Sequence, residues 1–263
     1  MPMANTSQEN RILIDFAKGF TNKLIATKLD VRLFGSIGVY LHCDLEDQGS
    51  ISEFTCNDID LVARLDQLLD LHAILSQKFR LEQANVYKNG EQRIYIWENN
   101  KKISKPIKIE IYFGQLYFNH LIPPPYFSEN TYLLPVTQLL LSKLAIHELT
   151  EKDIYSIALL LDHHEIGGGD SPEIINSNTL LHYWTQGAKG WEASHSCLNN
   201  LNIVKNRLAI KPELYLVDHK SVCAKIGNLI ISFQARKKPV WWQVRDKIGE
   251  RLKWYREVNY NDA

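Results

Sequence analysis

The first part of the chain alternates between helical and strand-like patterns of apolar positions. Over residues 8–28 the apolar side chains recur at helical spacing with charged residues between them, which predicts a helix. Residues 31–34 then form a short apolar run that predicts a strand. Gly35 and Ser36 end this run, and residues 37–42 predict the start of another helix. The expected order is therefore helix, strand, Gly-Ser turn and helix.

Acidic residues occupy one face of two later predicted strands. The apolar segment that begins at Asp58 predicts a buried strand, and Asp58 and Asp60 share one of its faces because side chains alternate along a strand. Residues 92–98 and 105–113 predict the two arms of a β-hairpin. In the second arm the isoleucines lie on one face and Glu110 lies on the other. A site could form on the face that carries Glu110.

Loops and helices are predicted around these strands and after them. Residues 44–55 are polar and acidic and predict a loop, and residues 66–81 predict a helix that covers the sheet. Residues 116–135, with three consecutive prolines, indicate the passage into a second region. The leucine-rich residues 136–147 and the capping-box-like residues 150–161 predict helices there.

Helices are expected to continue from this point to the end of the chain. Ser171 and Pro172 fit an N-cap and a first helical position. We therefore expect an α/β (α+β) domain with a mixed sheet over residues 1–125, followed by an all-α helical domain over residues 126–263.

Composition and charge narrow the classes of function. The chain of 263 residues has a formal net charge of zero, so a basic binding surface has to be local. The four cysteines show no CxxC pairing, which argues against a zinc site and a disulfide framework and suits a reducing compartment. The polar start and the absence of a long apolar run give the expectation of a cytoplasmic protein without a membrane segment.

The acidic residues and the Gly-Ser turn together indicate phosphate chemistry. Asp58 and Asp60 repel each other on one strand face, and a divalent cation such as Mg²⁺ is the natural compensation because hard cations take oxygen ligands. Glu110 would complete the ligand set. A strand that enters a helix through Gly35 and Ser36 favours phosphate, since backbone N–H groups point outward at a helix start. The alternatives are an ordinary strand-to-helix turn and a solvated strand face.

Several short motifs resemble a known family. Gly35-Ser36, then Asp58-Ile59-Asp60-Leu61, with Glu110 on a later strand, resemble the signature of the nucleotidyltransferase superfamily typified by DNA polymerase beta. In the second half, the resemblance is to the AbiEii-like branch, which includes toxins of toxin–antitoxin pairs. The segments that carry it are Leu134-Pro135-Val136, Leu140-Leu141-Ser142-Lys143-Leu144 and Glu151-Lys152-Asp153-Ile154.

The resemblance implies roles for particular residues. Gly35 and Ser36 would hold the β- and γ-phosphates of an NTP, and Asp58 and Asp60 would bind Mg²⁺ or Mn²⁺. Glu110 would bind a second metal ion or take the acceptor proton. In the second region, Lys143 would neutralise phosphate charge, and Lys152 and Asp153 match a family helix motif.

The implied reaction is transfer of a nucleoside monophosphate from an NTP to an acceptor hydroxyl, with release of pyrophosphate. The acceptor would be a tRNA or other RNA end, as for a toxin with a cognate antitoxin protein, or a small molecule of the aminoglycoside type. A catalytically silent nucleotide- or protein-binding module of the same fold is a further alternative. The stretch between Ser36 and Asp58 is longer than in compact members of the superfamily, which makes Asp44 and Glu46 rival acids.

Two further segments carry alternatives outside these motifs. His163-His164-Glu165 could suggest a metal ligand set, but a helix end with surface histidines is favoured. The C-terminal segment is basic and contains tryptophans, so it could bind RNA. The favoured interpretation is a core-packed helix with a solvated basic face. Its predicted apolar stripe consists of Trp241, Val244, Ile248, Leu252 and Tyr255.

Overall fold

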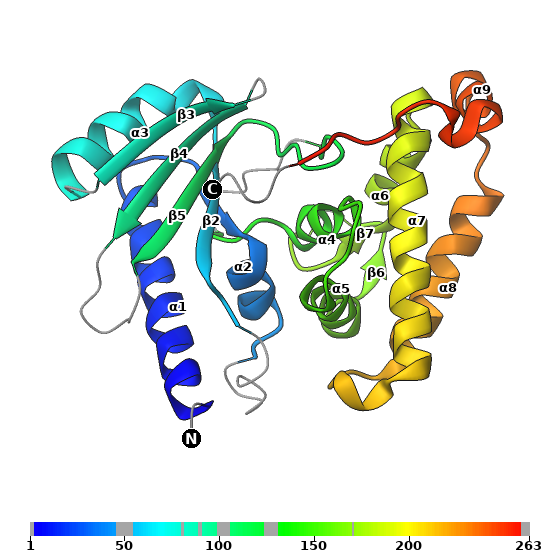
Figure 1. Ribbon diagram of the computed structural model, residues 1–263, viewed down its shortest axis with the longest axis horizontal. Helices are drawn as coiled ribbons and strands as arrows, with labels where there is room; N and C mark the ends of the chain where they lie inside the picture. The colour runs from blue at the N-terminus through cyan, green and yellow to red at the C-terminus, as the bar shows by residue number, and fades with distance from the viewer. Residues whose placement is uncertain are drawn as a thin grey trace. The chain divides into compact units, whose positions relative to one another are not determined.

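The protein is represented by a computed structural model that divides into two compact units (Figure 1). The first unit spans residues 1–116 and 124–134, and the second spans residues 117–123 and 135–263. The structure describes residues 3–45, 55–79, 82–88, 91–98, 106–123, 131–169 and 171–258.

The first unit is built around a five-stranded sheet. Its strands follow the order β1-β2-β5-β4-β3, in which β2 and β5 run parallel and the other neighbours run antiparallel. The predicted mixed sheet is therefore present. In chain order the elements are α1 (Met3–Ile25), β1 (Val31–Phe34), α2 (Gly35–His42), β2 (Asp58–Ala63), the 3-10 helix η2 (Leu65–Gln67), α3 (Leu68–Ile74), the π-helical η3 (Leu75–Phe79), β3 (Glu82–Lys88), β4 (Glu91–Glu98) and β5 (Ile107–Phe113).

Most of the predicted elements of this unit are confirmed. The strands β1 and β2, the helices α1 and α2, and the antiparallel pairing of β4 with β5 agree with the sequence pattern. The helix expected over 66–81 is present as one uninterrupted helical stretch over residues 65–79, made of η2, α3 and η3, whereas β3 was not predicted. Most of the predicted loop at 44–55, including Glu46, and the turn between β4 and β5 lie outside the described residues.

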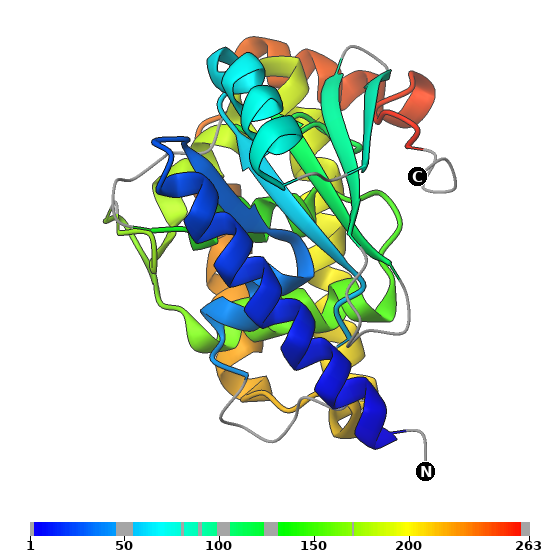
Figure 2. The ribbon, with the colours of Figure 1, turned by 90° about the vertical axis from the view of Figure 1, so that its left-hand side faces the viewer.

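The apolar faces of the strands form the core of the first unit. Leu33, Leu61 and Ile109 come from three adjacent strands and are fully buried. In Figure 2, α1 and α3 lie in front of the sheet, and α1 contributes a row of buried apolar side chains. This arrangement buries one face of the sheet, so the polar residues of β1, β2 and β5 lie on its other face.

The edge strand β1 has a second neighbour besides β2. The backbone N–H of Leu33 donates to the carbonyl of Tyr132 at 2.7 Å, and the N–H of Leu134 donates to the carbonyl of Leu33 at 2.9 Å. Residues 132–134 thus run alongside β1 and occupy hydrogen-bonding groups that an edge strand would otherwise expose.

The second unit is mostly helical, as predicted. The prediction of an all-α region missed one short parallel pairing of β6 with β7. The elements are α4 (Val136–Leu144), α5 (Glu151–His163), β6 (Ile166–Gly167), β7 (Ile175–Asn176), α6 (Ser177–Thr185), α7 (Gly187–Ile210), the 3-10 helix η4 (Pro212–Leu214), α8 (His219–Ala235), α9 (Val240–Ile248) and the 3-10 helix η5 (Gly249–Arg251). The domain boundary between residues 125 and 126 stays a prediction.

Two details of the second unit differ from the sequence analysis. Ser171 and Pro172 do not begin a helix, because α6 starts at Ser177 and Asn176 caps it by accepting a hydrogen bond from the Thr179 N–H at 3.0 Å. In α9 the expected apolar stripe is not buried, since Trp241 is 72% exposed. Among the described residues, no helix is both long and apolar enough to cross a membrane.

Candidate active site

The strand register places two of the predicted acids side by side. Asp60 on β2 and Glu110 on β5 are Cα partners in the parallel pair, and neighbouring strands lie about 4.8 Å apart. Asp58 is two residues before Asp60, so its side chain projects from the same face, opposite Lys108. The three carboxylates therefore lie on one face of two adjacent strands.

Gly35 connects this acidic face to the predicted phosphate turn. It has a φ of +66°, a left-handed conformation that suits glycine. A Cβ built at Gly35 would lie 2.0 Å from Oδ2 and 2.9 Å from Cγ of Asp60. The backbone at Gly35 thus packs directly against the Asp60 side chain, and no other residue fits here without displacing that carboxylate.

The first turn of α2 provides backbone donors next to Gly35. No side chain caps this turn, and the turn contains no acidic residue. Ser36 lies within it and is buried. Because the first N–H groups of a helix have no partner within the helix, this turn can accept an anion, as the sequence analysis predicted for Gly35 and Ser36.

Two basic residues on the same sheet face were given no role in the sequence analysis. The ammonium of Lys108 lies 3.5 Å from Oε2 of the buried Glu110. Arg32 on β1 is buried, its guanidinium donates to the carbonyl of Val31 at 2.8 Å, and desolvation lowers its pKa despite Asp30 nearby. The sequence signal for both residues was a cation alternating with apolar residues inside a predicted strand.

The charges of this face fit a divalent cation. Asp58, Asp60 and Glu110 bring three carboxylates to this face, and the Lys108 ammonium lies 3.5 Å from one of them, Glu110. Carboxylate oxygens are the ligands that Mg²⁺ prefers in proteins. Asp44, the rival acid within the described residues, is exposed and follows the end of α2.

The remaining predicted site residues belong to the second unit. Lys143 on α4 forms an ion pair with Asp153 on α5, with Nζ 2.9 Å from Oδ1, and both side chains are largely buried. Asp153 also completes a capping box with Thr150, whose hydroxyl donates to Oδ2 at 2.7 Å. Burial alone would raise the pKa of Asp153, but Lys143 and the Thr150 hydrogen bonds lower it overall. Lys152 is half-buried at the start of α5.

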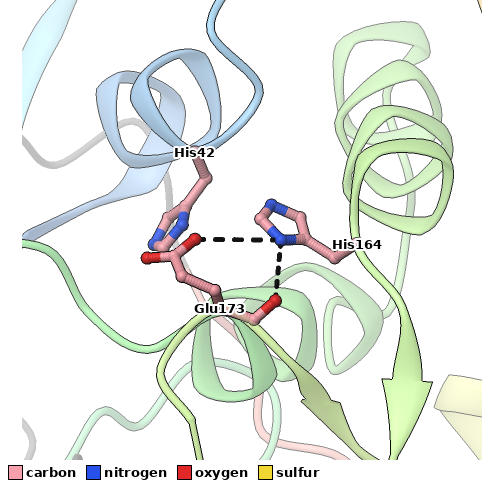
Figure 3. A group of neighbouring side chains, drawn as sticks. All are labelled: His42, His164 and Glu173. Carbon is pink, nitrogen blue, oxygen red and sulfur yellow. Dashed lines mark hydrogen bonds and ion pairs between the residues drawn. The ribbon is translucent and has the colours of Figure 1, made fainter.

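His164 differs from the surface histidine that the sequence suggested. It is buried, its Nδ1 lies 3.0 Å from the carbonyl oxygen of Glu173, and the Glu173 carboxylate lies 3.9 Å from the same nitrogen (Figure 3). His42, also drawn in Figure 3, belongs to the first unit, where its Nε2 lies 2.8 Å from the carbonyl of Leu134. Each histidine thus has a local hydrogen-bonding role within its own unit.

Comparisons with known proteins gave only distant similarities. No family model matches the chain, and no curated protein matches it by sequence. An antigenic nucleotidyltransferase-like protein from Paracoccidioides brasiliensis is similar in structure, with 13% identity, a TM-score of 0.46, and coverage of 82% of this chain and 93% of that one. The Cid1 poly(U) polymerase is similar with 15% identity and a TM-score of 0.30, over 68% of this chain and 48% of that one. Because both TM-scores are below 0.5, these similarities carry no argument about function.

Proposed function

We propose that the first unit is the catalytic part of a nucleotidyltransferase. The enzyme would move a nucleoside monophosphate from an NTP to an acceptor hydroxyl and release pyrophosphate. One observation carries the proposal: the backbone of Gly35 packs against the Asp60 carboxylate, and Asp60 is in register with Glu110. In this proposal the turn at Gly35 would bind phosphate directly beside two acids that would bind a metal ion.

Each residue of this face receives a role in the proposal. Asp58 and Asp60 would hold Mg²⁺ or Mn²⁺, and Glu110 would act as a further ligand or accept the proton of the acceptor hydroxyl. Gly35 and Ser36 would bind the β- and γ-phosphates through backbone N–H groups and a hydroxyl. The bound cation would supply charge stabilisation at the transferred phosphate.

The second unit would assist through its basic residues. Lys143 would neutralise phosphate or pyrophosphate charge, and the ion pair with Asp153 would fix the position of its ammonium. The role of Lys152 is less direct, because the residue lies in the first turn of α5 next to the capping box.

The acceptor that we favour is a tRNA or other RNA end. The motifs around Leu140 and Glu151 that resemble the AbiEii-like branch support a toxin-like enzyme of the cytoplasm with a cognate antitoxin protein. The alternative acceptor is a small hydroxylated molecule of the aminoglycoside type. The zero net charge of the chain is compatible with this alternative, because such an acceptor requires no overall positive charge of the enzyme.

Incubation with radiolabelled NTPs tests the proposal. Each common NTP is supplied with Mg²⁺ or Mn²⁺ and with either total RNA or an aminoglycoside panel. We expect label on RNA, and we expect Asp60→Asn to abolish it. Asp70→Asn, which removes an exposed acid of α3 in the same unit, is the matched control and should retain activity. No transfer to either class of acceptor under any of these conditions would contradict the proposal.

The Lys108–Glu110 ion pair favours one alternative, a silent module of the same fold. In such a module the lysine ammonium would take the place of a metal ion beside Glu110. Calorimetry separates the two proposals. NTP binding that requires metal and is lost in Asp58→Asn/Asp60→Asn indicates an active site, whereas NTP binding indifferent to both indicates the silent module.

A further inference from the structure

The outer face of α9 exposes a large aromatic side chain. Trp241 and Val240 are each 72% exposed, and Val244, one helical turn after Val240, is 41% exposed. Large apolar side chains gathered on one exposed face mark interaction sites more often than ordinary surface. We call the set of Val240, Trp241 and Val244 the α9 face.

The inner side of the same helix is firmly anchored in the second unit. Arg245 is buried, its guanidinium lies 4.4 Å from the centre of the Trp191 ring, and its Nε donates to the Glu192 carboxylate at 3.1 Å. Trp242 Nε1 donates to the carbonyl of Trp184 at 3.0 Å. These contacts fix the rotation of α9 about its own axis, and the α9 face therefore points away from the core of the second unit.

The acids near the α9 face are already engaged. Asp246 accepts a hydrogen bond from Trp191 Nε1 at 2.7 Å, and the Glu250 carboxylate lies 2.9 Å from Nε2 of His195. Glu257 pairs with Lys253 at 2.6 Å. Each of these three carboxylates thus has a hydrogen-bonding or ion-pair partner within the described part of the second unit.

Several cations of the same segment have no such partner. Lys237 precedes α9 by three residues, Lys247 lies one turn after Val244, and Arg251 lies one turn further on, in η5. All three are exposed, and within the described part of the chain none of them forms an ion pair. The surface around the α9 face is therefore positively charged.

The start of α9 adds to this positive character. Pro239 is the N-cap residue, no side chain accepts from the first backbone N–H groups, and the first turn has no acidic residue. The partial positive charge of a helix N-terminus is thus left without a negative side chain beside Trp241.

We propose that the α9 face binds single-stranded RNA. One base would stack on the indole of Trp241, and the flanking phosphates would bind Lys237, Lys247 and Arg251. The choice of RNA among anionic polymers rests on the proposed function, in which an RNA end is the acceptor. A protein partner is disfavoured because the apolar part of the α9 face is one indole and two valines, and stable protein interfaces are larger.

Fluorescence anisotropy with a labelled single-stranded RNA tests the proposal on the full chain. Trp241→Ala should weaken binding about tenfold, as loss of one stacked base does. Trp241→Phe should recover part of this loss. Ile210→Ala removes an equally exposed apolar side chain at the end of α7 and is the matched control, for which we expect wild-type binding.

The salt dependence of binding provides a second measurement. Lys247→Gln should weaken binding to all sequences and make the slope of log K against log salt shallower by about one unit, because one phosphate contact is lost. An unchanged salt slope in Lys247→Gln would show that Lys247 contacts no phosphate. An unchanged RNA affinity in Trp241→Ala would overturn the proposal.

The outcomes also separate this inference from the proposed function. The binding measurements need neither NTP nor metal, and the control Asp70→Asn should bind RNA as the wild type does. Trp241-dependent binding therefore supports the α9 face even when no nucleotide transfer is found. If the wild type binds no RNA but self-associates in sedimentation velocity, and Trp241→Ala is monomeric, the α9 face is a protein interface and the inference is wrong.

Discussion

Substitution of Gly35 by alanine tests the central contact of the candidate active site. The added Cβ would lie 2.0 Å from Oδ2 of Asp60, and real Cβ atoms essentially never approach another heavy atom closer than 3.0 Å. The carboxylate therefore has to move by at least about 1 Å, and a misplacement of this size in a catalytic constellation costs about 100-fold in rate. This loss corresponds to about 2.7 kcal/mol of transition-state stabilisation.

The same substitution also carries a backbone cost. A non-glycine residue at the φ of +66° found at Gly35 costs about 1–2 kcal/mol, and reduced freedom of the unfolded chain returns part of it. Gly114→Ala is the matched control, because Gly114 has a φ of +75° in the same unit and its added Cβ would meet only Leu65, at 3.4 Å. Gly35→Ala should lose at least as much stability as Gly114→Ala, because only its Cβ displaces a side chain, and only Gly35→Ala should lose activity.

Two assays measure these effects. Urea denaturation gives the free energy of unfolding of each variant, and transfer of labelled nucleotide under saturating metal gives kcat/KM. If Gly35→Ala and Gly114→Ala retain equal activity, the Gly35–Asp60 contact has no part in catalysis and the reasoning is refuted. If the two variants lose activity equally, the loss follows from reduced stability alone, and this result also refutes a catalytic role of the Gly35–Asp60 contact.

Three further predictions concern charges elsewhere in the fold. Lys108→Met removes one partner of the ion pair with the buried Glu110, so the metal-free variant should lose about 1–3 kcal/mol of stability. Mn²⁺ should raise its melting temperature more than that of the wild type; equal rises would show that Lys108 does not compete with a metal ion, and no rise in either would contradict a metal site there. Asp153→Ala removes both the ion pair with Lys143 and half of the capping box, and it should lower the free energy of unfolding by about 1–2 kcal/mol in urea at pH 7. Burial, with nearby histidines adding to it, lowers the pKa of His120 from 6.5 to about 4. His120 therefore binds a proton more strongly in the unfolded chain than in the folded protein, so the free energy of unfolding should fall as the pH drops from about 6.5 toward 4, by up to about 3 kcal/mol. When denaturation is measured as a function of pH, His120→Gln should show a smaller fall than the wild type.

The placement of the three acidic residues on one sheet face could be predicted from the sequence because it depends on local alternation. A strand puts Asp58 and Asp60 on one face whatever surrounds it, and the same alternation separates Glu110 from the isoleucines. The register of Asp60 with Glu110 and the contact with Gly35 could not be read in this way, since both depend on which distant strands pair.

The errors of fold prediction have physical reasons of the same kind. The strand β3 is polar and lies at the end of the described sheet, next to β4, so it carries little apolar periodicity. The signal that was missed is the Asn89-Gly90 pair, typical of two-residue hairpin turns, which lies outside the described residues. In α9 the spacing predicted a helix correctly, but Arg245 became the buried residue because Trp191 and Glu192 of α7 supply its partners.

The backbone bonds between β1 and residues 132–134 have a practical consequence for anyone who expresses the first unit alone. A fragment that stops at residue 125 would lack the residues that hydrogen-bond to the backbone of Leu33. Its β1 edge would then expose unpaired N–H and C=O groups, which favour pairing with a strand of another molecule and aggregation. A fragment that extends to residue 134 would retain these hydrogen bonds, so the position at which the fragment ends decides whether the isolated sheet stays monomeric.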